Sequence, residues 1–450
     1  MDVLRLAGAD VAALGGPVAA AARIRELAPA GESVAAATAE IIAAVRERGD
    51  AALLELTRRF DTAGRDPAPL VVEPERLDDA IREMPLELVA GLQVAISNVA
   101  QAADASLAGA QEPAIELPQG QTLRLRELPV ASAAVYVPGG RAPYPSTVVM
   151  GVVTARAAGV IDVAVCSPPG PDGEIDPVVL GTCRLCGVER IYRMGGAQAV
   201  AALAYGTETV APVETIVGPG NLYVQEAKRQ LSGVVGIEGF AGPSDLLVVL
   251  GAACGAGEVR LAALDMLAQA EHGAGSLVAA VSPSAELCER LAATLGELVV
   301  ERPTVGDAAF AIAEVADPAE ALALANAFAA EHLELIGEDV EQLSASVRSA
   351  GALFVGASSA TAFGDYVAGS NHILPTAGAA RFSSGLTPRH FRRRMTEVRI
   401  GPAAAKLAAA GAPIARAEGF EVHAESMEAR RPAGSAGRPS PKDIGENGPS

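Results

Sequence analysis

Residues 133–166 read AAVYVPGGRAPYPSTVVMGVVTARAAGVIDVAVC, and this stretch decides the fold class. Its two ends, Ala133–Val137 and Val160–Cys166, are short runs of β-branched and small apolar residues, which are typical of buried strands. The segment between them, from about Ser146 to Ala158, is long enough for a helix. A strand, a helix and a second strand in this order predict a βαβ unit, whose two strands lie parallel in one sheet.

The same alternation continues along the chain. We expect further helices over 177–186 and 221–231, and further strands over 190–194, 213–217, 245–250 and 277–281, with two more βα repeats to about Phe354. The strands fall into two blocks that meet near residue 243. The sequence therefore predicts an α/β protein with two parallel-sheet domains.

The segments outside the two blocks have a different character. The chain is expected to be helical from Ser33 to about residue 130, with breaks near Asp50 and Pro85, and to become helical and basic again from Thr387. We predict an N-terminal helical arm (1–33), a main α/β domain (34–135 plus 244–386), a second α/β domain (136–243), a small C-terminal helical subdomain (387–431) and a disordered tail (432–450).

Composition excludes several classes of partner. The chain has 450 residues and a net charge of −19, so it lacks the basic face that nucleic acids and anionic membranes require. No uncharged apolar run reaches the roughly 18 residues of a membrane span, and charged residues interrupt the first ten positions. Five cysteines, an odd number and unevenly spread, fit a reducing compartment. We expect a cytoplasmic protein without nucleic-acid or membrane partners.

The stretch Asp265–Gly273, read DMLAQAEHG, looks like half of a metal site. On a helix, Gln269 and His272 lie on one face, and Gly273 is the residue type that ends a helix in the left-handed conformation. Two ligand-capable side chains would then meet at a helix end. A polar helix end with a capping histidine explains the same pattern.

Three glycine-rich turns follow strands in the second domain. They read YVPGG from Tyr136, GGAQ up to Gln198 and GPGN up to Asn221. Glycines at a strand-to-helix turn let backbone N–H groups approach phosphates. The usual Gly-x-Gly-x-x-Gly is missing, so we expect Rossmann-like domains that are incomplete and non-classical. Each turn alone fits a plain tight turn, whereas three at one sheet edge fit a dinucleotide site as well as they fit plain turns.

Two further motifs carry polar groups suited to chemistry. Ser244 lies at the seam between the blocks, where it would cap a turn or contact a ligand. Glu331 and His332 are expected late in an apolar helix of about 318–332. An adjacent carboxylate and imidazole are the right types for acid and base catalysis at neutral pH, and a solvated helix end explains them equally well.

The remaining candidates lie near the C-terminal end. Asp365 belongs to the Gly-rich stretch 364–372, which ends at His372 and suits a loop that lines a site. Glu418 and His423 lie in the terminal subdomain, where a solvated surface is the default interpretation. Gln269, His272, Asp365 and a further histidine would give a mixed nitrogen and oxygen site suited to zinc or a related divalent ion.

The ordered motifs together resemble the histidinol dehydrogenase family. The resemblance extends from about Ser33 to Arg431. It rests on the segments RGDAALLELT, VPGG, GGAQA, GPGN, AGPS, QAEHG, EHL, GDY and SNHILP, which occur in this order. This family consists of zinc-dependent, NAD-linked homodimers that oxidise L-histidinol through L-histidinaldehyde to L-histidine.

The resemblance implies a role for each matching residue. Zinc would be held by Gln269, His272, Asp365 and His423, with His423 reaching into the other subunit of a homodimer that exchanges the segment 387–431. Substrate would contact Ser244, Gln269, His272, His332, Asp365, Glu418 and His423, and NAD would contact Tyr136, Gln198 and Asn221. His332 would take the hydroxyl proton, and Glu331 would activate the water that attacks the aldehyde.

Two alternatives use the same residues. A paralogue with the same zinc and NAD apparatus would act on another small alcohol, such as a sulfonated diol, and would be expected to lose Glu418 or His423, both of which are present. A metal-dependent hydrolase, or a metal-binding protein without catalysis, would use the four ligands without NAD.

Overall fold

The computed structural model describes residues 2–28, 33–108, 113–139, 142–240, 242–273, 275–305 and 307–430. The chain forms two compact units. The first contains Met1–Ala108 and Pro129–Arg392, and the second contains Gly109–Leu128 and Arg393–Ser450. Each is described by itself. The predicted disordered tail, 432–450, lies outside the described residues.

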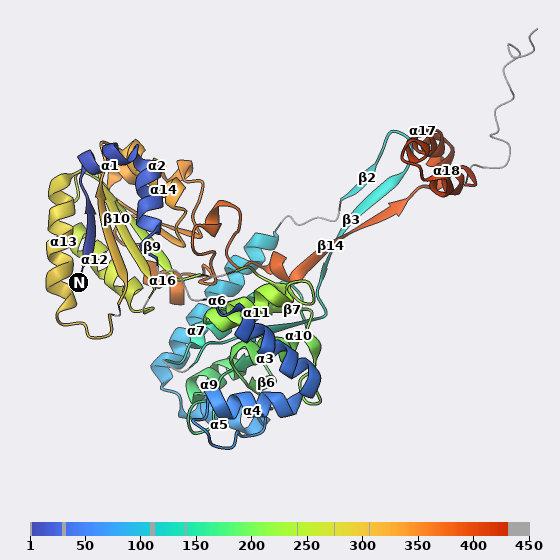
Figure 1. The fold of residues 1–450 in the computed structure, drawn as a ribbon, viewed down its shortest axis with the longest axis horizontal. Helices are drawn as coiled ribbons and strands as arrows, with labels where there is room; N and C mark the ends of the chain where they lie inside the picture. The colour runs from blue at the N-terminus through green and yellow to red at the C-terminus, as the bar shows by residue number, and fades with distance from the viewer. Residues whose placement is uncertain are drawn as a thin grey trace, which may run out of the picture. The chain divides into compact units, whose positions relative to one another are not determined.

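The first unit contains two parallel sheets, and the larger has six strands (Figure 1). Their order is β1 (Val3–Leu6), β11 (Ala309–Glu314), β10 (Leu277–Ser282), β9 (Asp245–Leu250), β12 (His332–Ile336) and β13 (Ala352–Val355). Helices α12 (Ala256–Ala270) and α13 (Ala285–Val299) cover one face, and α1 (Gly8–Leu14), α2 (Pro17–Arg25) and α14 (Pro318–Phe328) cover the other. The sheet is therefore buried on both sides.

Strand β9 shows why the sequence folds this way. All six of its residues are buried. Leu247 and Val249 pack with the α1, α2 and α14 side, whereas Leu246 and Val248 pack with the α12 and α13 side. A strand buried on both faces is a continuous apolar run, as the sequence predicted for 245–250.

The N-terminal segment differs from the predicted arm, because it is part of the larger sheet. Strand β1 pairs in parallel with β11, and α2 packs against α14. Gly15 takes a left-handed φ of 103° and ends α1, and Pro17 begins α2. The glycines and proline that suggested an irregular arm thus mark the boundaries of two short helices.

The smaller sheet has five parallel strands. Their order is β6 (Arg190–Arg193), β5 (Asp162–Ser167), β4 (Ser132–Tyr136), β7 (Thr215–Val217) and β8 (Gly236–Ile237). The chain moves outward from β4 in one direction to β6, then returns to β7 on the other side of β4. This reversal of strand order is the arrangement in which doubly wound sheets bind dinucleotides.

Helices from two parts of the sequence cover the smaller sheet. They are α3 (Ala35–Arg48), α4 (Asp50–Phe60), α5 (Pro74–Glu83) and α6 (Leu86–Leu107) from the N-terminal part, and α7 (Pro145–Val148), α8 (Thr154–Ala157), α9 (Pro177–Leu185), α10 (Gly196–Tyr205) and α11 (Leu222–Leu231) from the block itself. A π-helical turn, η1 (Val149–Val153), joins α7 to α8. The expected breaks near Asp50 and Pro85 separate α3 from α4 and α5 from α6.

The domain boundaries therefore differ from those predicted. Leu53 of α4 shares a core with Tyr136 and Val200, and Leu77 of α5 shares a core with Val135. Segment 34–108 thus belongs with 136–243 rather than with 244–386. Amphipathic helices cover whichever sheet face the tertiary fold offers, and their sequence pattern does not specify which.

The second unit contains strands that the sequence analysis expected to be helical. Strands β2 (Ala114–Glu116), β3 (Thr122–Pro129) and β14 (Arg392–Arg399) form a sheet in the order β14-β3-β2, in which β2 and β3 are antiparallel. An ion pair joins Arg394 to Glu127. Apolar and charged residues alternate in β3, which is the period-two pattern of a half-exposed strand. Helices α17 (Ala404–Ala417) and α18 (Glu421–Glu428) follow, as predicted.

Short elements complete the fold. They are α15 (Glu338–Glu341), α16 (Thr361–Tyr366), and the 3-10 turns η2 (Ser344–Ser346), η3 (Ala379–Arg381), η4 (Pro388–Phe391) and η5 (Gly401–Ala403). Helix α6 is the one described helix that is long and apolar enough to cross a bilayer by composition. Its residues Leu92, Ala95 and Val99 pack into a core of the first unit, so a single helix of this kind is weak support for a membrane span.

Two helical glycines provide opposite tests of this packing. A Cβ added at Gly151, in η1, would lie 2.5 Å from the side chain of Val135, whereas one added at Gly91, in α6, meets nothing within 4 Å. We expect Gly151→Ala to lower the free energy of unfolding by about 1–3 kcal/mol through overpacking. Gly91→Ala should raise it by about 0.5–1 kcal/mol because alanine favours the helix. Denaturant titration of both variants checks the opposite signs.

Candidate active site

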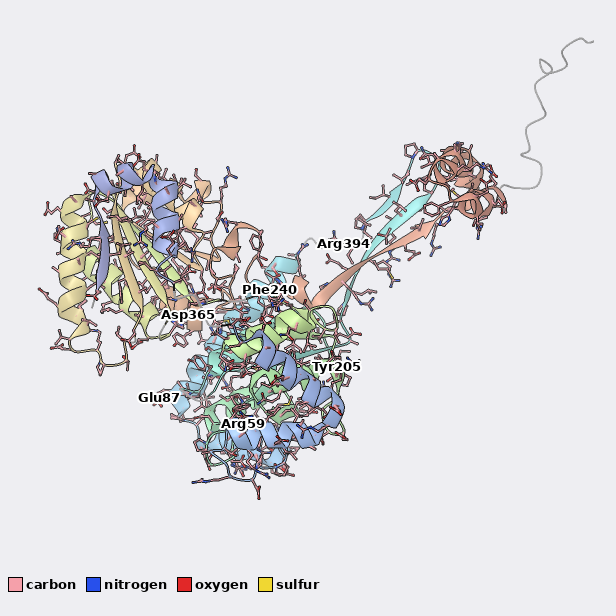
Figure 2. All side chains as sticks on the ribbon, viewed as in Figure 1. Arg59, Glu87, Tyr205, Phe240, Asp365 and Arg394 are labelled. Atoms are coloured by element: carbon pink, nitrogen blue, oxygen red, sulfur yellow. The ribbon has the colours of Figure 1, made fainter. Side chains whose placement is uncertain are left out.

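The first unit has a cavity of about 670 Å³ between segments of its two sheets. Of the residues predicted from the sequence, seven line it: Tyr136, Asn221, Ser244, His272, Glu331, His332 and Asp365. Two residues of the lining, Asp365 and Phe240, are labelled in Figure 2. Residues that are far apart in the sequence are thus brought to one site.

The two sheets face the cavity with opposite ends of their strands. Tyr136 ends β4, and Gly218 follows the end of β7, so the smaller sheet contributes the carboxyl ends of its strands. Ser244 immediately precedes β9, and His332 begins β12, so the larger sheet contributes the amino ends. Ligands of open α/β sheets usually lie outside the carboxyl ends, and only the smaller sheet follows this rule.

The sequence analysis expected Glu331 and His332 at the end of a helix, and this prediction is wrong. Helix α14 ends at Phe328, Ala329 takes a left-handed φ of 53°, and His332 is the first residue of β12. Both side chains are buried. The start of a central strand holds them in the interior, which excludes the alternative of a solvated helix end.

Hydrogen bonds hold the Glu331 carboxylate in place. Its Oε2 accepts from the Ser244 hydroxyl and, at 3.0 Å, from the backbone N–H of Asp245. Burial raises the pKa of Glu331 to about 7, against the lowering effect of the nearby His332. A carboxyl group with a pKa close to neutrality is suited to accept and release a proton.

His332 lies between two carboxylates. Its Nε2 is 3.4 Å from Oδ1 of Asp365, and its Nδ1 is 4.0 Å from Oε2 of Glu331. Burial lowers the pKa of His332, but the charges of Glu331 and Asp365 outweigh this effect and raise the pKa to about 9. The pKa of Asp365 is lowered because the contact with His332 outweighs burial, so this carboxylate stays ionised.

His372 occupies a position that the sequence analysis did not assign a role. Its Nδ1 lies 3.0 Å from the carbonyl oxygen of Asp365, and its Nε2 lies 3.2 Å from the Thr147 hydroxyl of α7. Burial lowers the pKa of His372, which fits a neutral ring that donates through Nδ1 and accepts through Nε2. His372 thus connects the Asp365 segment to the helix that begins beside the smaller sheet.

Asn371, the residue before His372, also connects this segment to the helical run that starts with α7. Its amide donates to the carbonyl oxygen of Met150 and to the hydroxyl of Thr154, each at 3.1 Å. Met150 lies in the π-helical turn η1, and its carbonyl oxygen also accepts from the Thr154 hydroxyl at 2.6 Å. The Ser-Asn-His motif was the available signal for this contact, but the sequence does not reveal its partner.

Gln269 lies on helix α12, as expected, whereas His272 lies in the turn that follows the helix. Helix α12 ends at Ala270, and Gly273 has a left-handed φ of 107°. The Gln269 amide donates to Ser244 Oγ at 2.5 Å, and His272 Nδ1 lies 3.1 Å from the Gln269 carbonyl oxygen. A histidine whose Nδ1–H is engaged in this way presents Nε2 as its coordinating nitrogen.

The donor set partly fits a divalent metal. His272 and Asp365 both line the cavity. Within the described ranges, no group of three or more His, Cys, Asp or Glu side chains is placed to hold a metal ion. A three-donor set that contains His272 and Asp365 would need a donor of another type, such as the Gln269 amide, which is a weaker ligand than a carboxylate and donates to Ser244 here.

Glu418 and His423 belong to the second unit. Glu418 follows α17, and His423 lies in α18 with its ring centroid 5.2 Å from that of Phe420. Both are exposed. In this unit they have the environment of a solvated helix surface.

Contacts through Tyr136 connect the three glycine-rich turns at the edge of the smaller sheet. A Cβ on Gly218, whose φ is 120°, would lie 2.1 Å from the carbonyl oxygen of Tyr136, so only glycine allows this close approach. The Tyr136 hydroxyl accepts from the N–H of Gly196 at 3.0 Å. Asn221 caps α11 by accepting from Val224 N–H at 3.1 Å. The turns form one backbone-lined edge.

Two polar side chains near this edge, Lys228 and Gln198, are buried. Lys228 is fully buried, donates to the Gly218 carbonyl, and pairs with Glu238 at 2.7 Å. Gln198 is also buried, in α10, and does not line the cavity, unlike Tyr136 and Asn221. The dinucleotide residues predicted from the sequence therefore have unequal access to the cavity.

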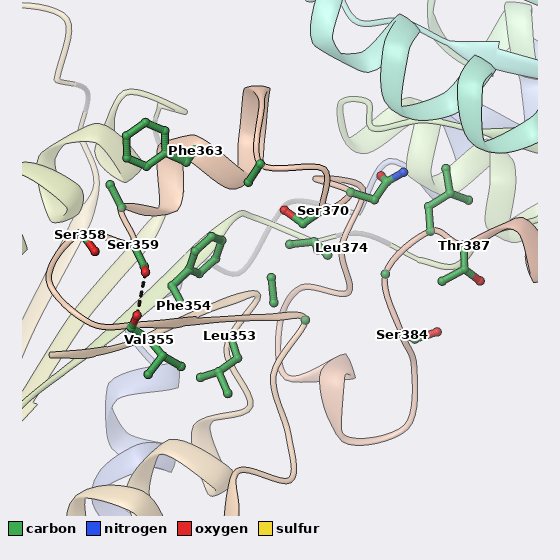
Figure 3. Close-up of a pocket in the computed structure, with 17 residues that line it drawn as sticks. Leu353, Phe354, Val355, Ser358, Ser359, Phe363, Ser370, Leu374, Ser384 and Thr387 are labelled. Carbon is green, nitrogen blue, oxygen red and sulfur yellow. Dashed lines mark hydrogen bonds between the residues drawn. The ribbon is translucent and has the colours of Figure 1, made fainter. Parts of the chain in front are cut away.

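A second hollow of about 690 Å³ lies beside the edge strand β13 (Figure 3). Leu353, Phe354 and Phe363 contribute apolar surface, and the Ser359 hydroxyl donates to the Val355 carbonyl at 2.7 Å. Its lining contains no ionisable side chain. The acid and base groups lie in the first cavity.

Two parallel sheets, a buried carboxylate–imidazole pair and a glycine-lined sheet edge are typical of α/β oxidoreductases, and the comparisons identify the family. The family model named Histidinol dehydrogenase matches residues 26–431. The chain belongs to the histidinol dehydrogenase family.

Relatives agree with this membership. The chain is 41% identical to the histidinol dehydrogenase of Gluconobacter oxydans over 405 residues, covering 88% of this chain and 93% of the relative. It is 43% identical to that of Cereibacter sphaeroides, covering 88% and 92%. The crystal structure of histidinol dehydrogenase from Elizabethkingia anophelis matches with a TM-score of 0.83 at 28% identity, covering 91% of this chain and 95% of that one.

Proposed function

We propose that this protein oxidises L-histidinol with NAD, through L-histidinaldehyde, to L-histidine, in the final steps of histidine biosynthesis. The observation that carries the proposal is the buried Glu331–His332 pair in a cavity that also contains the glycine-lined sheet edge. Family membership supplies the substrate. The relatives above carry the histidinol dehydrogenase name, which favours this activity over that of a paralogue acting on another small alcohol.

In the first oxidation, His332 takes the proton from the substrate hydroxyl as hydride leaves for NAD. The raised pKa of His332 reflects the charges of Glu331 and Asp365. Glu331, with a pKa of about 7, exchanges protons near neutrality. A cation bound to Asp365 would offset one of the two charges that raise the pKa of His332, which would lower this pKa and let the imidazole accept a proton.

In the second oxidation, Glu331 activates a water that attacks the aldehyde, and a second NAD accepts hydride from the resulting diol. Ser244 and the Asp245 N–H hold one oxygen of the Glu331 carboxylate, so its direction is fixed. One site serves both steps because the two residues are adjacent and face the same cavity.

We assign zinc to Gln269, His272 and Asp365 of this chain and to His423 of the partner subunit in a homodimer. Bound there, zinc would supply a Lewis acid that orients the amine and imidazole of the substrate. His272 is prepared for this role by the contact of its Nδ1 with the helix end. Substrate would also contact Ser244, His332 and Glu418.

We assign NAD to the edge formed by Tyr136, Gln198 and Asn221. The approach of Gly218 to the Tyr136 carbonyl supports a backbone-lined phosphate site there. Gln198 is buried and does not line the cavity, so its assignment rests on the family resemblance. The acidic chain and its free cysteines favour the cytoplasm as the compartment.

The stoichiometry of NADH tests the function. Zinc-loaded protein incubated with limiting L-histidinol and excess NAD should give about two NADH per substrate, one for each hydride. Absorbance of NADH and chromatographic quantification of histidine provide the measurement. One NADH per substrate would identify a simple alcohol dehydrogenase, and none would contradict the proposal. A hydrolase or a metal-binding protein would also show no stabilisation by NAD in a thermal-shift experiment.

The two members of the acid–base pair should have separable effects. His332→Asn should slow both oxidations by about 10²–10⁴-fold because each needs a proton acceptor. Glu331→Gln should slow the oxidation of supplied histidinaldehyde by about 10²-fold or more and affect histidinol oxidation much less. Single-turnover kinetics with each substrate checks this. Equal losses in both steps for Glu331→Gln would remove its assigned role.

Removal of the metal tests the ligand assignment. Chelation should abolish binding of L-histidinol, measured by calorimetry, and added zinc should restore it. His272→Asn should weaken zinc affinity by at least about tenfold in a competition with a chromogenic chelator, because one ligand is lost. His390→Asn is the matched control, since His390 contacts Thr387 in the η4 turn. Unchanged zinc affinity in His272→Asn would refute the assignment.

A further inference from the structure

An arginine of the N-terminal segment reaches the residues around Glu331. Arg25 is the last residue of α2, and it does not line the cavity. It also lies one position before the region that matches the family model, 26–431. Neither the cavity nor the family match assigns it a role.

Arg25 binds both a carboxylate and a helix end. Its two terminal nitrogens contact the two oxygens of Asp245 at 2.6 and 3.2 Å. The same guanidinium donates to the carbonyl oxygens of Phe328, at 2.6 and 3.0 Å, and of Ala329, at 3.1 Å. It also lies 3.7 Å above the Phe328 ring. Only the planar, five-donor guanidinium satisfies all these acceptors together.

Asp245, which Arg25 holds in place, forms hydrogen bonds with Glu331. Its carboxylate is 1% exposed, and its Oδ1 accepts from the Glu331 N–H at 2.8 Å. Its Oδ2 accepts from the Ala377 N–H at 3.1 Å. In return, the Asp245 N–H donates to the Glu331 carboxylate at 3.0 Å. Asp245 therefore fixes both the backbone and the side chain of Glu331.

The turn between α14 and β12 also depends on Arg25. Ala329 holds a left-handed conformation that costs energy for a residue with a side chain. Donors at the last carbonyls of a helix compensate for such a turn. Glu331 follows this turn by two residues, so a shift of the turn would move its carboxylate directly.

We infer that Arg25 is a positioning residue for Glu331, acting through Asp245 and through the carbonyl groups that end α14. The inference rests on the proposed role of Glu331 in aldehyde oxidation. Without Arg25, the Asp245 carboxylate is left buried beside Glu331 without its cation, and the turn loses three hydrogen bonds to the guanidinium. The Glu331 carboxylate then loses its fixed direction, whereas the groups that bind substrate are not touched.

The test compares Arg25→Gln, Arg25→Lys and Arg23→Gln. Arg23 lies on the same helix and pairs only with the exposed Glu26 among the described contacts, so it is the matched control. Aldehyde oxidation is measured from supplied histidinaldehyde with NAD. The first step is measured separately in reverse, from histidinaldehyde with NADH. Thermal unfolding of each variant is recorded alongside.

Arg25→Gln should lower kcat for aldehyde oxidation by about tenfold to a hundredfold, the effect of a small misplacement of a catalytic group. The reverse first step should change much less, and KM for histidinaldehyde should stay within about twofold because no substrate contact is lost. Arg25→Lys keeps the charge and should recover part of kcat, and Arg23→Gln should match the unmodified protein.

Other results separate the possible failures. If the unmodified protein releases no NADH from histidinol, the proposed function fails. If it is active and Arg25→Gln retains full kcat, or loses both steps equally, the inference about Arg25 is wrong. If Arg25→Gln does not fold, Arg25→Lys decides: equal loss in both steps contradicts a positioning role, and selective loss in aldehyde oxidation supports it.

Discussion

The buried carboxylate of Asp245 is the point on which the site depends. Asp245 is the first residue of the central strand β9. Its carboxylate pairs with Arg25 of helix α2 and accepts hydrogen bonds from the backbone N–H groups of Glu331 and Ala377. A buried charge is tolerated only when such partners surround it. Three segments far apart in the sequence are therefore held at the amino end of one strand by a single side chain.

A second set of contacts connects this edge to the smaller sheet. Asn371 and His372 reach the helical run that starts with α7, where the π-helical turn presents the Met150 carbonyl and where Thr147 donates to the imidazole. The contact between His372 and the Asp365 carbonyl extends the connection to the ionised carboxylate beside His332. The same short motif thus connects the glycine-lined half of the cavity to the acid–base half.

The chemistry of the cavity follows from unequal burial. Glu331 and His332 are almost fully buried, and each alters the pKa of the other. His272 and Asn221 are exposed. Proton transfer needs groups whose pKa is set by a dry, fixed environment, whereas binding a metal ion or a cofactor needs groups that a ligand can reach. His272 and Asn221 meet the second requirement, whereas Gln269 and Gln198 are buried.

The sequence by itself determined the parallel βα alternation, a helix that ends shortly before Gly273, a helix that begins near Asn221, and the family. Each of these depends on local pattern: buried strands are apolar runs, and helix ends need particular residues. It did not determine that residues 3–25 join the larger sheet, that α3–α6 cover the smaller one, that 122–129 and 392–399 are strands, or that His332 begins a strand. These features depend on which surfaces remain to be buried once distant segments meet. Tertiary structure alone therefore placed Arg25 against Asp245, which contacts Glu331.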